Sequence, residues 1–416
     1  MLITRPRFHF TAASGWINDP HGITFRDGRY HTFFQYLPGR TDWAPDCRWG
    51  HASGEDLFSL TELPVALAPG GGDGGIWTGA LVRDDDGKTR VFYTSTSQPD
   101  IGIGRIRLAA PADEDWITWK KGPFVAEAPA GLELVAYRDP FLRHDPDGWR
   151  MFVGAGDSRG TAMALSYHSD DLEAWQYEGV ALERSRHETA DVWMGALWEC
   201  PQIIDVDGHA VMLSSVWEGD VLYYAGYAIG EYEAGVFTAQ HWGRLTYGDS
   251  YYAPSFFRDD RGHPCITMWM RGVADFEAGW AGAHSIPYVL SVVNSALVAT
   301  PHSDLERYRS ADGVGQINGL AADIAWVPDS GELTVTSGGR PVVVLTATED
   351  GDLRVTTADA DTVVPVSGDV RLIVDGPVVE ISSAAGLIGA AVAPSGDDLV
   401  VKVGGNPAMI AHALAP

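Results

Sequence analysis

Short runs in which apolar and polar residues alternate cover most of the chain, and turn residues separate them. Such runs are typical of β-strands in antiparallel sheets. In the first three hundred residues one pattern recurs, in which a turn glycine precedes an apolar run. It occurs as "RDGRYHTFF", "DDGKTRVFYT", "PDGWRMFVG", "VDGHAVMLSS" and "DRGHPCITMWM". Asp-Gly, present in the first four, tolerates the positive φ of two-residue hairpin turns, so the pattern predicts a recurring hairpin.

The five predicted hairpins are evenly spaced along the chain. Successive turn glycines are 59, 61, 60 and 54 residues apart, and they are Gly28, Gly87, Gly148, Gly208 and Gly262. About 60 residues is the size of a four-stranded propeller blade with long loops. Five such blades would close a ring without leaving a long exposed sheet edge. The spacing therefore predicts a five-bladed β-propeller over 1–300, with a sandwich of coincidentally similar hairpins as the alternative.

The pattern changes after a short segment at 301–313, which we expect to link two domains. From 314 to 416 the chain is rich in Val, Thr, Ala, Asp and Gly, in runs such as "RPVVVLTAT", "DVRLIVDG" and "PVVEISS". Period-two alternation ending in turn residues predicts a small C-terminal β-sandwich, and so an all-β chain. We expect it to cover apolar propeller surface, with sugar binding or oligomer contacts as alternatives. The oligomeric state is left open.

Composition and charge limit the kinds of ligand and the cellular compartment that we expect for this protein. A net charge of −27 argues against nucleic acid as a partner and favours a neutral or cationic ligand. Fifteen tryptophans offer faces that suit a neutral polyhydroxylated ring. No apolar stretch approaches the length of a membrane span, and the start lacks a signal-peptide core. The only cysteines, Cys47, Cys200 and Cys265, give no disulfide framework, so we expect a cytoplasmic protein with no membrane partner.

The residues nine positions before each turn glycine indicate a shared site. They are Asp19, Thr78, Asp139, Glu199 and Ala253. Three of the five are carboxylates, in the contexts "NDP", "RDP" and "WECP". Equivalent positions in a closed ring surround one axis, so the spacing predicts that these acids converge on a central pocket.

Three gathered acids allow more than one kind of chemistry. Hard cations want six or more oxygen ligands, and neither an Asp-x-Asp-x-Asp loop nor a His-Glu-x-x-His motif occurs. We therefore expect no metal and no cofactor, although a metal site and purely structural turn acids remain alternatives. The favoured interpretation is cleavage of a glycosidic bond, which needs one ionised carboxylate and one protonated acid.

Neighbours along the chain suggest which acid carries the proton. Glu199 stands between Trp198 and Cys200, an apolar setting that favours the protonated form. Asp19 follows the side-chain donor of Asn18 and should stay ionised as a nucleophile. Asp139 follows a cation, Arg138, which favours an anion able to bind sugar hydroxyls. Cys200 is interpreted as a small buried residue, with tuning of the neighbouring acid as the alternative.

Five segments in this order resemble the motifs of glycoside hydrolase family 32, the invertase, inulinase and levanase family. They are "WINDPHG", "FFQYLP", "WGHA", "YRDPF" and "WECPQ". The resemblance is strong over 16–309 and weak beyond. It implies a five-bladed propeller with a C-terminal β-sandwich, and release of β-fructofuranosyl units with retention of configuration.

Carried over residue by residue, the resemblance implies a complete site. Asp19 is the nucleophile, Glu199 the acid/base and Asp139 the stabiliser of the transition state. Around the fructosyl ring it implies Asn18, Gln35, Trp43, Trp77, Thr78 and Arg138. Tyr252 in "DSYYAPSFF" and Trp280 in "GWAGAHSIPYVLS" border the pocket in the same way.

The chain also departs from the family pattern. His21 stands where the family usually has Asn, "IWTGA" replaces Phe-Ser-Gly-Ser, and "YAPSFF" lacks a Gln. These changes leave the three acids intact, but they leave open how the site binds the leaving group of the substrate. His21 is either an ordinary loop residue or a contact to the second sugar. A small, tightly lined pocket would favour sucrose or short fructosides over long fructan.

The sequence therefore predicts a retaining β-fructofuranosidase acting on sucrose or short fructo-oligosaccharides through a covalent intermediate. Retention requires the two reacting carboxyl groups to be about 5–5.5 Å apart. The alternatives are a fructosyltransferase, an exo-hydrolase of inulin or levan, an inverting arabinosidase or xylosidase, and a non-catalytic fructan-binding propeller.

Overall fold

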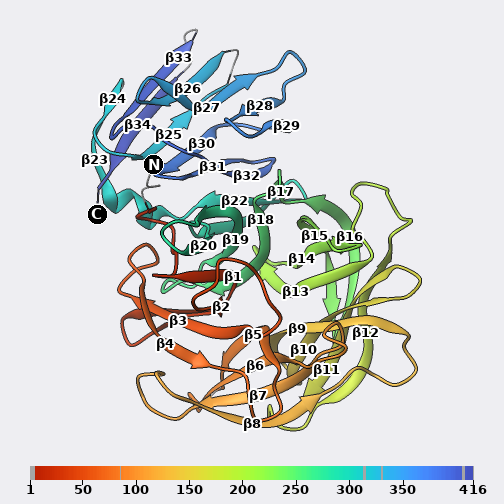
Figure 1. Ribbon diagram of the computed structural model, residues 1–416. Coiled ribbons are helices and arrows are strands. Elements are labelled where there is room, and N and C mark those ends of the chain that lie inside the picture. Colours follow the sequence, from red (N-terminus) through yellow and green to blue (C-terminus); the bar gives the residue numbers. More distant parts are fainter. Residues whose placement is uncertain (1–4, 85, 313–314, 329–330, 405–407, 416) are drawn as a thin grey trace.

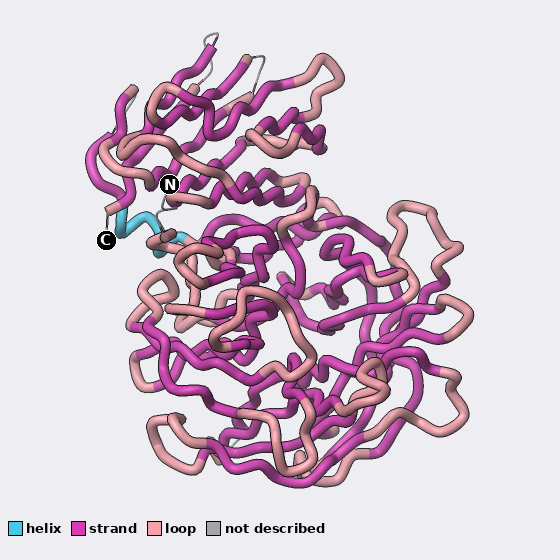
Figure 2. The backbone as a smooth tube through the Cα atoms, viewed as in Figure 1, coloured by secondary structure: helices cyan, strands magenta, loops and turns pink. Residues whose placement is uncertain are grey.

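The computed structural model describes residues 5–84, 86–312, 315–328, 331–404 and 408–415. Four-stranded sheets radiate from a common centre in the first three hundred residues, and a second body of two sheets packs on one side (Figure 1). Strands and loops make up nearly all of the described chain, with one short helix between the two bodies (Figure 2). The predicted five-bladed propeller with a C-terminal sandwich is confirmed.

Each blade consists of four antiparallel strands, and each predicted hairpin joins the first strand of a blade to the second. Blade 1 contains β1 (Gly15–Arg26), β2 (Arg29–Leu37), β3 (Arg48–Gly54) and β4 (Thr61–Leu67). Blade 2 contains β5 (Gly75–Arg83), β6 (Thr89–Thr96), β7 (Arg105–Pro111) and β8 (Trp119–Ala126). Blade 3 contains β9 (Leu134–Asp145), β10 (Gly148–Asp157), β11 (Thr161–Ser169) and β12 (Gln176–Ser185). Blade 4 contains β13 (Leu197–Val206), β14 (His209–Glu218), β15 (Val221–Glu233) and β16 (Val236–Arg244). Blade 5 contains β18 (Tyr251–Arg258), β19 (Pro264–Asp275), β21 (Tyr288–Val293) and β22 (Ala296–Pro301).

The first strand of every blade is the innermost one, and these five strands form a ring. Each of β1, β5, β9, β13 and β18 contacts the next, and β18 contacts β1. The ring is closed by an extra strand, β20 (Trp280–His284), which pairs with β19 and runs parallel to β1. The amide of Gly15 donates to the Gly279 carbonyl at 2.8 Å across this junction. Blades 1 and 5 therefore share one continuous sheet.

A β-bulge interrupts each innermost strand near its start. The register shifts between Ile17 and Pro20 in β1, and equivalent shifts occur in β5, β9, β13 and β18. Three bulge residues have a positive φ: Asp139 (64°), Cys200 (51°) and Ala253 (48°). In four blades a proline follows directly, which fits a bulge because proline has no N–H for the ladder. These bulges turn the side chains at one level of the ring toward its axis.

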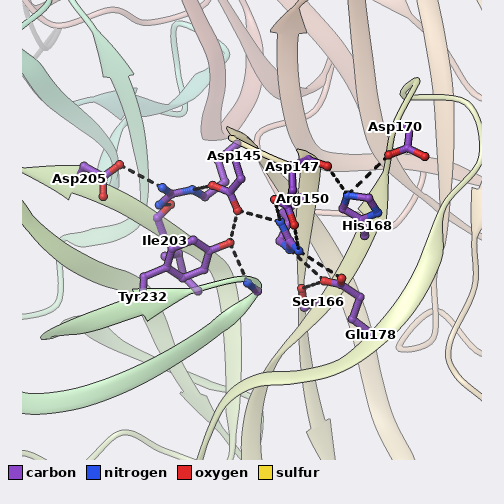
Figure 3. A network of polar contacts seen from close by, with 12 residues as sticks. Asp145, Asp147, Arg150, Ser166, His168, Asp170, Glu178, Ile203, Asp205 and Tyr232 are labelled. Carbon is purple, nitrogen blue, oxygen red and sulfur yellow. Dashed lines mark hydrogen bonds and ion pairs between the residues drawn. The ribbon is translucent and has the colours of Figure 1, made fainter.

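Charged side chains join blades 3 and 4 at the end opposite these bulges. The Arg150 side chain is 3% exposed and forms ion pairs with Asp145, Asp147 and Glu178 (Figure 3). Arg143 joins the same group, since its guanidinium pairs with Asp145 and with Asp205 of blade 4. The network thus ties three strands of blade 3 to its neighbour.

The C-terminal body is a sandwich of two antiparallel sheets around an apolar core. Its first sheet contains β32 (Gly386–Ala391), β31 (Val378–Ser383), β30 (Val370–Asp375), β25 (Ala321–Trp326), β34 (Met409–Leu414) and β23 (Arg309–Asp312). Its second contains β24 (Gln316–Ile317), β33 (Leu399–Gly404), β26 (Glu332–Ser337), β27 (Arg340–Ala347), β28 (Leu353–Thr356) and β29 (Asp361–Val364). The segment predicted as a linker holds the 3-10 helix Ser303–Tyr308 and β23, which already pairs with β34.

The two bodies are joined by backbone pairing and by buried charge. A two-residue propeller strand, β17 (Thr246–Tyr247), extends the first sandwich sheet by pairing in parallel with β32. Next to it the His9 ring lies between two sandwich carboxylates, with Nδ1 2.8 Å from Asp375 and Nε2 2.6 Å from Glu380. Although burial opposes a charge there, the two carboxylates raise the pKa of His9 to about 9. Within the described residues no helix is long and apolar enough to cross a membrane.

Candidate active site

The structure brings the three predicted acids together around Cys200. The Cys200 sulfur lies 3.9 Å from Asp19 Oδ2 and 3.7 Å from Asp139 Oδ2, and its backbone amide donates to Asp139 Oδ2 at 3.1 Å. Glu199 is the preceding residue of β13. Carboxylates from blades 1, 3 and 4 therefore meet at the level of the bulges, although the sequence separates them by 120 and 60 residues.

Asp19 is held by neutral donors. Its Oδ2 accepts from Thr78 Oγ1 at 2.6 Å and from Gln35 Nε2 at 3.0 Å, and its Oδ1 accepts from Asn18 Nδ2 at 3.0 Å. Burial raises the pKa of Asp19, and the nearby charge of Glu199 adds to this, while the Thr78 and Asn18 hydrogen bonds oppose it. The site thus fixes this carboxylate without giving it a cationic partner.

Glu199 has a cation on one oxygen and a phenol on the other. Arg138 Nε donates to Oε1 at 2.8 Å, and Tyr252 OH donates to Oε2 at 2.5 Å. The guanidinium carbon of Arg138 also lies 5.9 Å from the centre of the Trp77 ring. The apolar setting expected from Trp198 and Cys200 is therefore wrong, because the Glu199 carboxylate contacts the polar groups of Arg138 and Tyr252.

Asp139 differs from its expected setting as well. Burial, followed by the charge of Glu199, raises the pKa of Asp139, and the charge of Arg138 opposes this without prevailing. Arg138 donates to Glu199, and no hydrogen bond joins it to Asp139 among the described residues. The charge of Arg138 therefore favours the ionised form of Asp139 as expected, but burial and the facing charge of Glu199 outweigh it and set the direction of the shift.

Aromatic rings line one side of the site. Trp77 is nearly buried, and its Nε1 donates to the Pro45 carbonyl at 2.9 Å. Trp43 meets it edge to face at 5.7 Å and is 42% exposed. Trp16 Nε1 donates to Asn18 Oδ1 at 3.0 Å and so orients the amide that holds Asp19. This wall offers apolar ring faces close to hydrogen-bond donors, the combination that a sugar ring needs.

Two predicted residues lie elsewhere. Trp280 is 1% exposed in the apolar core at the ring closure, where the Arg5 guanidinium lies 4.8 Å from its ring centre. It therefore has no free face for a sugar. His21 is also 1% exposed, with its ring 4.1 Å from the ring of Trp49. Direct contact with a second sugar does not fit that position.

Some supporting groups were missed by sequence reasoning. Thr94 Oγ1 accepts from the Asp139 amide at 2.8 Å, and Ser215 Oγ accepts from the Ala253 amide at 2.9 Å. Each of these hydroxyl groups belongs to the neighbouring blade and provides the hydrogen-bond acceptor for the backbone amide of a bulge residue. In four blades the bulge residue is followed directly by proline, and this repeated pattern could have predicted the bulges from the sequence. When the blades are aligned on that proline, the residue equivalent to Asp19 in blade 4 is Cys200 and not Glu199.

One group of potential metal ligands lies at the opposite end of blade 5. Asp259 Oδ2, Cys265 Sγ and a His302 ring nitrogen are within 4.8 Å of one another. The Nδ1 atom of His302 accepts from the Asp304 amide, so its Nε2 carries the proton that it donates to Asp259 at 3.2 Å. Because that nitrogen has no free lone pair, hydrogen bonding rather than metal binding accounts for the group.

Comparisons with known proteins point to one family of glycoside hydrolases. The model described as "Glycosyl hydrolases family 32 N-terminal domain" matches residues 9–301. A sucrose-6-phosphate hydrolase of Zymomonas mobilis is 30% identical over 338 residues, which cover 75% of this chain and 64% of that protein. A fructan 6-exohydrolase of Beta vulgaris is 27% identical over 349 residues, covering 74% of this chain and 56% of that protein. The chain thus matches less than two thirds of the length of these curated relatives.

Solved structures show the same fold over the whole chain. A β-fructofuranosidase of Bombyx mori superposes with a TM-score of 0.85 at 24% identity, covering 99% of this chain and 95% of that one. A mutant of that protein is described in complex with sucrose. A fructan 1-exohydrolase of Cichorium intybus superposes with a TM-score of 0.80 at 20% identity, covering 99% of this chain and 97% of that one.

Proposed function

The chain belongs to glycoside hydrolase family 32, and from that membership we propose a retaining β-fructofuranosidase. It releases terminal β-D-fructofuranosyl units from sucrose or short fructo-oligosaccharides. The observation that carries the proposal is the meeting of Asp19, Asp139 and Glu199 at Cys200, each with a different set of hydrogen-bond donors. Different donors give chemically equivalent side chains different tasks.

The reaction proceeds in two displacements. Asp19 attacks the anomeric carbon of the fructosyl unit while the bond to the leaving oxygen breaks and Glu199 gives that oxygen its proton. In the second step Glu199 takes a proton from water, the water oxygen bonds to the anomeric carbon, and the bond to Asp19 breaks. Fructose leaves with its original configuration, and both acids return to their starting states.

The remaining residues serve these two steps. Thr78, Gln35 and Asn18 aim Asp19, and Tyr252 with Arg138 aims Glu199. Asp139 binds sugar hydroxyls and stabilises positive charge at the anomeric carbon.

We further propose that the substrate is uncharged, although several relatives are named as sucrose-6-phosphate hydrolases. The loops at the acid end of the blades contain three arginines and no lysine. All three are already paired: Arg40 with Asp42 at 2.7 Å, Arg159 with Asp157 at 2.7 Å, and Arg186 with Glu218 at 3.0 Å. A phosphate approaching these loops would find each of their arginines already paired with a carboxylate of the described residues, and the net charge of −27 repels it further.

The experiment is a kinetic comparison on sucrose, sucrose 6-phosphate, 1-kestose, inulin and levan. We expect the highest kcat/KM on sucrose or kestose and at least a tenfold lower value on the phosphate, a difference of about 1.4 kcal/mol. NMR of the first product should show β-fructofuranose. A first product of α configuration would contradict retention, and a preference for the phosphate would contradict the uncharged substrate.

Variants of the two reacting acids separate catalysis from mere binding. Asp19→Asn and Glu199→Gln keep the size of each side chain and remove its charge. Each should lower kcat by about 10³-fold or more while the melting temperature stays within a few degrees, because the interactions lost act mainly in the transition state. If the wild type itself released no fructose yet bound kestose, the chain would be a fructan-binding propeller.

A further inference from the structure

A narrow cavity continues along the propeller axis beyond the acids. Segments of all five innermost strands line it, and its polar lining includes His21, Thr78, Asp139 and Gln202. The cavity measures about 60 Å³. On this measure one water molecule needs roughly 10–15 Å³, so the space is sufficient for at least one.

His21 is a buried polar side chain on this cavity that lacks a protein partner. Neither Nδ1 nor Nε2 of its ring has a hydrogen bond to a described residue, although the side chain is 1% exposed. Burial and the neighbouring His284 keep the pKa of His21 well below its usual value, although the nearby Asp19 backbone opposes this, so the ring is neutral. A neutral imidazole has one donor and one acceptor, and each costs about 1–3 kcal/mol if left unpaired in the interior.

Gln35 provides a third unpaired atom on the same face of blade 1. His21 is opposite Phe33 in the β1–β2 ladder, so the side chains of His21, Phe33 and Gln35 lie on one face. Gln35 Nε2 donates both to Asp19 Oδ2 at 3.0 Å and to Thr78 Oγ1 at 2.7 Å. Its Oε1 atom is buried and has no partner among the described residues. Three such atoms on one face, two of them on the His21 ring that lines the cavity, indicate a partner that the protein itself does not supply.

We propose that His21 is a positioning residue, which binds an internal water molecule between blades 1 and 2 and through it holds the Gln35 amide on Asp19. The water accepts from the ring N–H and donates to Gln35 Oε1. This interaction fixes which way the amide is turned. With the amide reversed, its carbonyl oxygen would face the Asp19 carboxylate and Asp19 would lose one of its donors.

The water itself can be tested without reference to activity. A crystal structure of the full chain at about 1.5 Å resolution should show a water within about 3.2 Å of both a His21 ring nitrogen and Gln35 Oε1. In His21→Phe, whose ring can keep the packing on Trp49, that water should be lost. A wild-type structure without the water, or with protein atoms on all three groups, would overturn the proposal while leaving the proposed function untouched.

The positioning role rests on the proposed function, and its test is a pH profile. His21→Phe should lower kcat about tenfold with little change in KM, and should move the acid limb of kcat/KM to higher pH. His21→Asn keeps a donor and an acceptor and should restore most of both values. Phe33→Leu, an apolar change on the same face, should cost stability only. If His21→Phe loses stability but keeps the pH profile, the residue is structural and the positioning role is wrong.

Discussion

At the scale of single residues, the partners of the three acids set their roles. Asp19 accepts hydrogen bonds from hydroxyl and amide groups, Glu199 from a guanidinium and a phenol, and Asp139 from a backbone amide. A nucleophile without a cationic partner keeps its electron density available for the anomeric carbon. An acid held from both sides keeps a fixed direction toward the leaving oxygen.

The hydroxyl of Thr78 sets part of the pH dependence. It donates to Asp19 at 2.6 Å and opposes the rise in the pKa of Asp19 that burial causes. Asp19 must be ionised to attack, so kcat/KM falls as the pH drops through that pKa. Thr78→Val removes the donor at equal size and should move this acid limb upward by roughly one pH unit. Thr24→Val, a change at a hydroxyl that donates to the Gly22 carbonyl in β1 and to no other group among the described residues, should leave the limb in place.

Tyr252 should act on the rate rather than on binding. Its hydroxyl is 2.5 Å from Glu199 Oε2, and the side chain is 3% exposed, so Tyr252→Phe fits the same space. The variant should fold normally and lower kcat by about 10–100-fold, because Glu199 loses one of the two donors that direct it. Steady-state kinetics on sucrose measure this. An unchanged kcat with a raised KM would instead assign Tyr252 to substrate binding.

The acids could be predicted from sequence, whereas most of their partners could not. Asp19, Asp139 and Glu199 stand in distinctive local sequences at a regular spacing. The bond from Arg138 to Glu199 crosses between blades, and it depends on a bulge at Asp139 with positive φ. No pattern of apolar and polar positions encodes that backbone angle. The sequence therefore associates Arg138 with its chain neighbour Asp139, whereas the structure pairs it with Glu199.

At the scale of elements, local signals were the reliable ones. Asp-Gly turns and alternating runs specify hairpins through contacts within about twenty residues, and all five hairpins were predicted. The strands β17 and β20 were not predicted, because each is short and pairs in parallel with a strand far away in the sequence, although β20 also forms an antiparallel hairpin with β19. Their sequences carry no sign of the partner.

The ion-pair network of Arg150 should stabilise blades 3 and 4 without affecting catalysis (Figure 3). Arg150→Met leaves the buried Asp145 with one cation fewer and Glu178 with none of its own. We expect the free energy of unfolding to fall by about 3 kcal/mol, since breaking a buried pair leaves charge uncompensated. Urea unfolding measures it.

An exposed arginine on the same blade provides the control. Arg159 is 82% exposed, and its buried partner Asp157 keeps hydrogen bonds from the amides of Arg159 and Thr161, so Arg159→Met should cost about 1 kcal/mol or less. Both variants should keep the kcat of the wild type. Equal losses of stability in the two would show that burial of the Arg150 network adds nothing.

At the scale of the whole molecule, the propeller and the sandwich share one core. Buried sandwich residues such as Val378 and Leu387 pack in the same apolar cluster as Met270 and Leu290 of blade 5. This supports the expected covering role of the sandwich. The boundaries at 300 and 314 stay a prediction, because composition changes gradually there while β23 already pairs with β34.

The buried His9 should make this junction sensitive to alkali. Its two carboxylate partners raise the pKa of His9 from 6.5 to about 9, so the imidazolium stabilises the folded state fully below pH 6.5 and loses that effect as the pH rises through 9. His9→Gln should cost about 3 kcal/mol at pH 6, measured by urea unfolding, and much less at pH 10. A cost independent of pH would mean that His9 contributes packing and neutral hydrogen bonds, and that the charge between the two bodies is not what holds them.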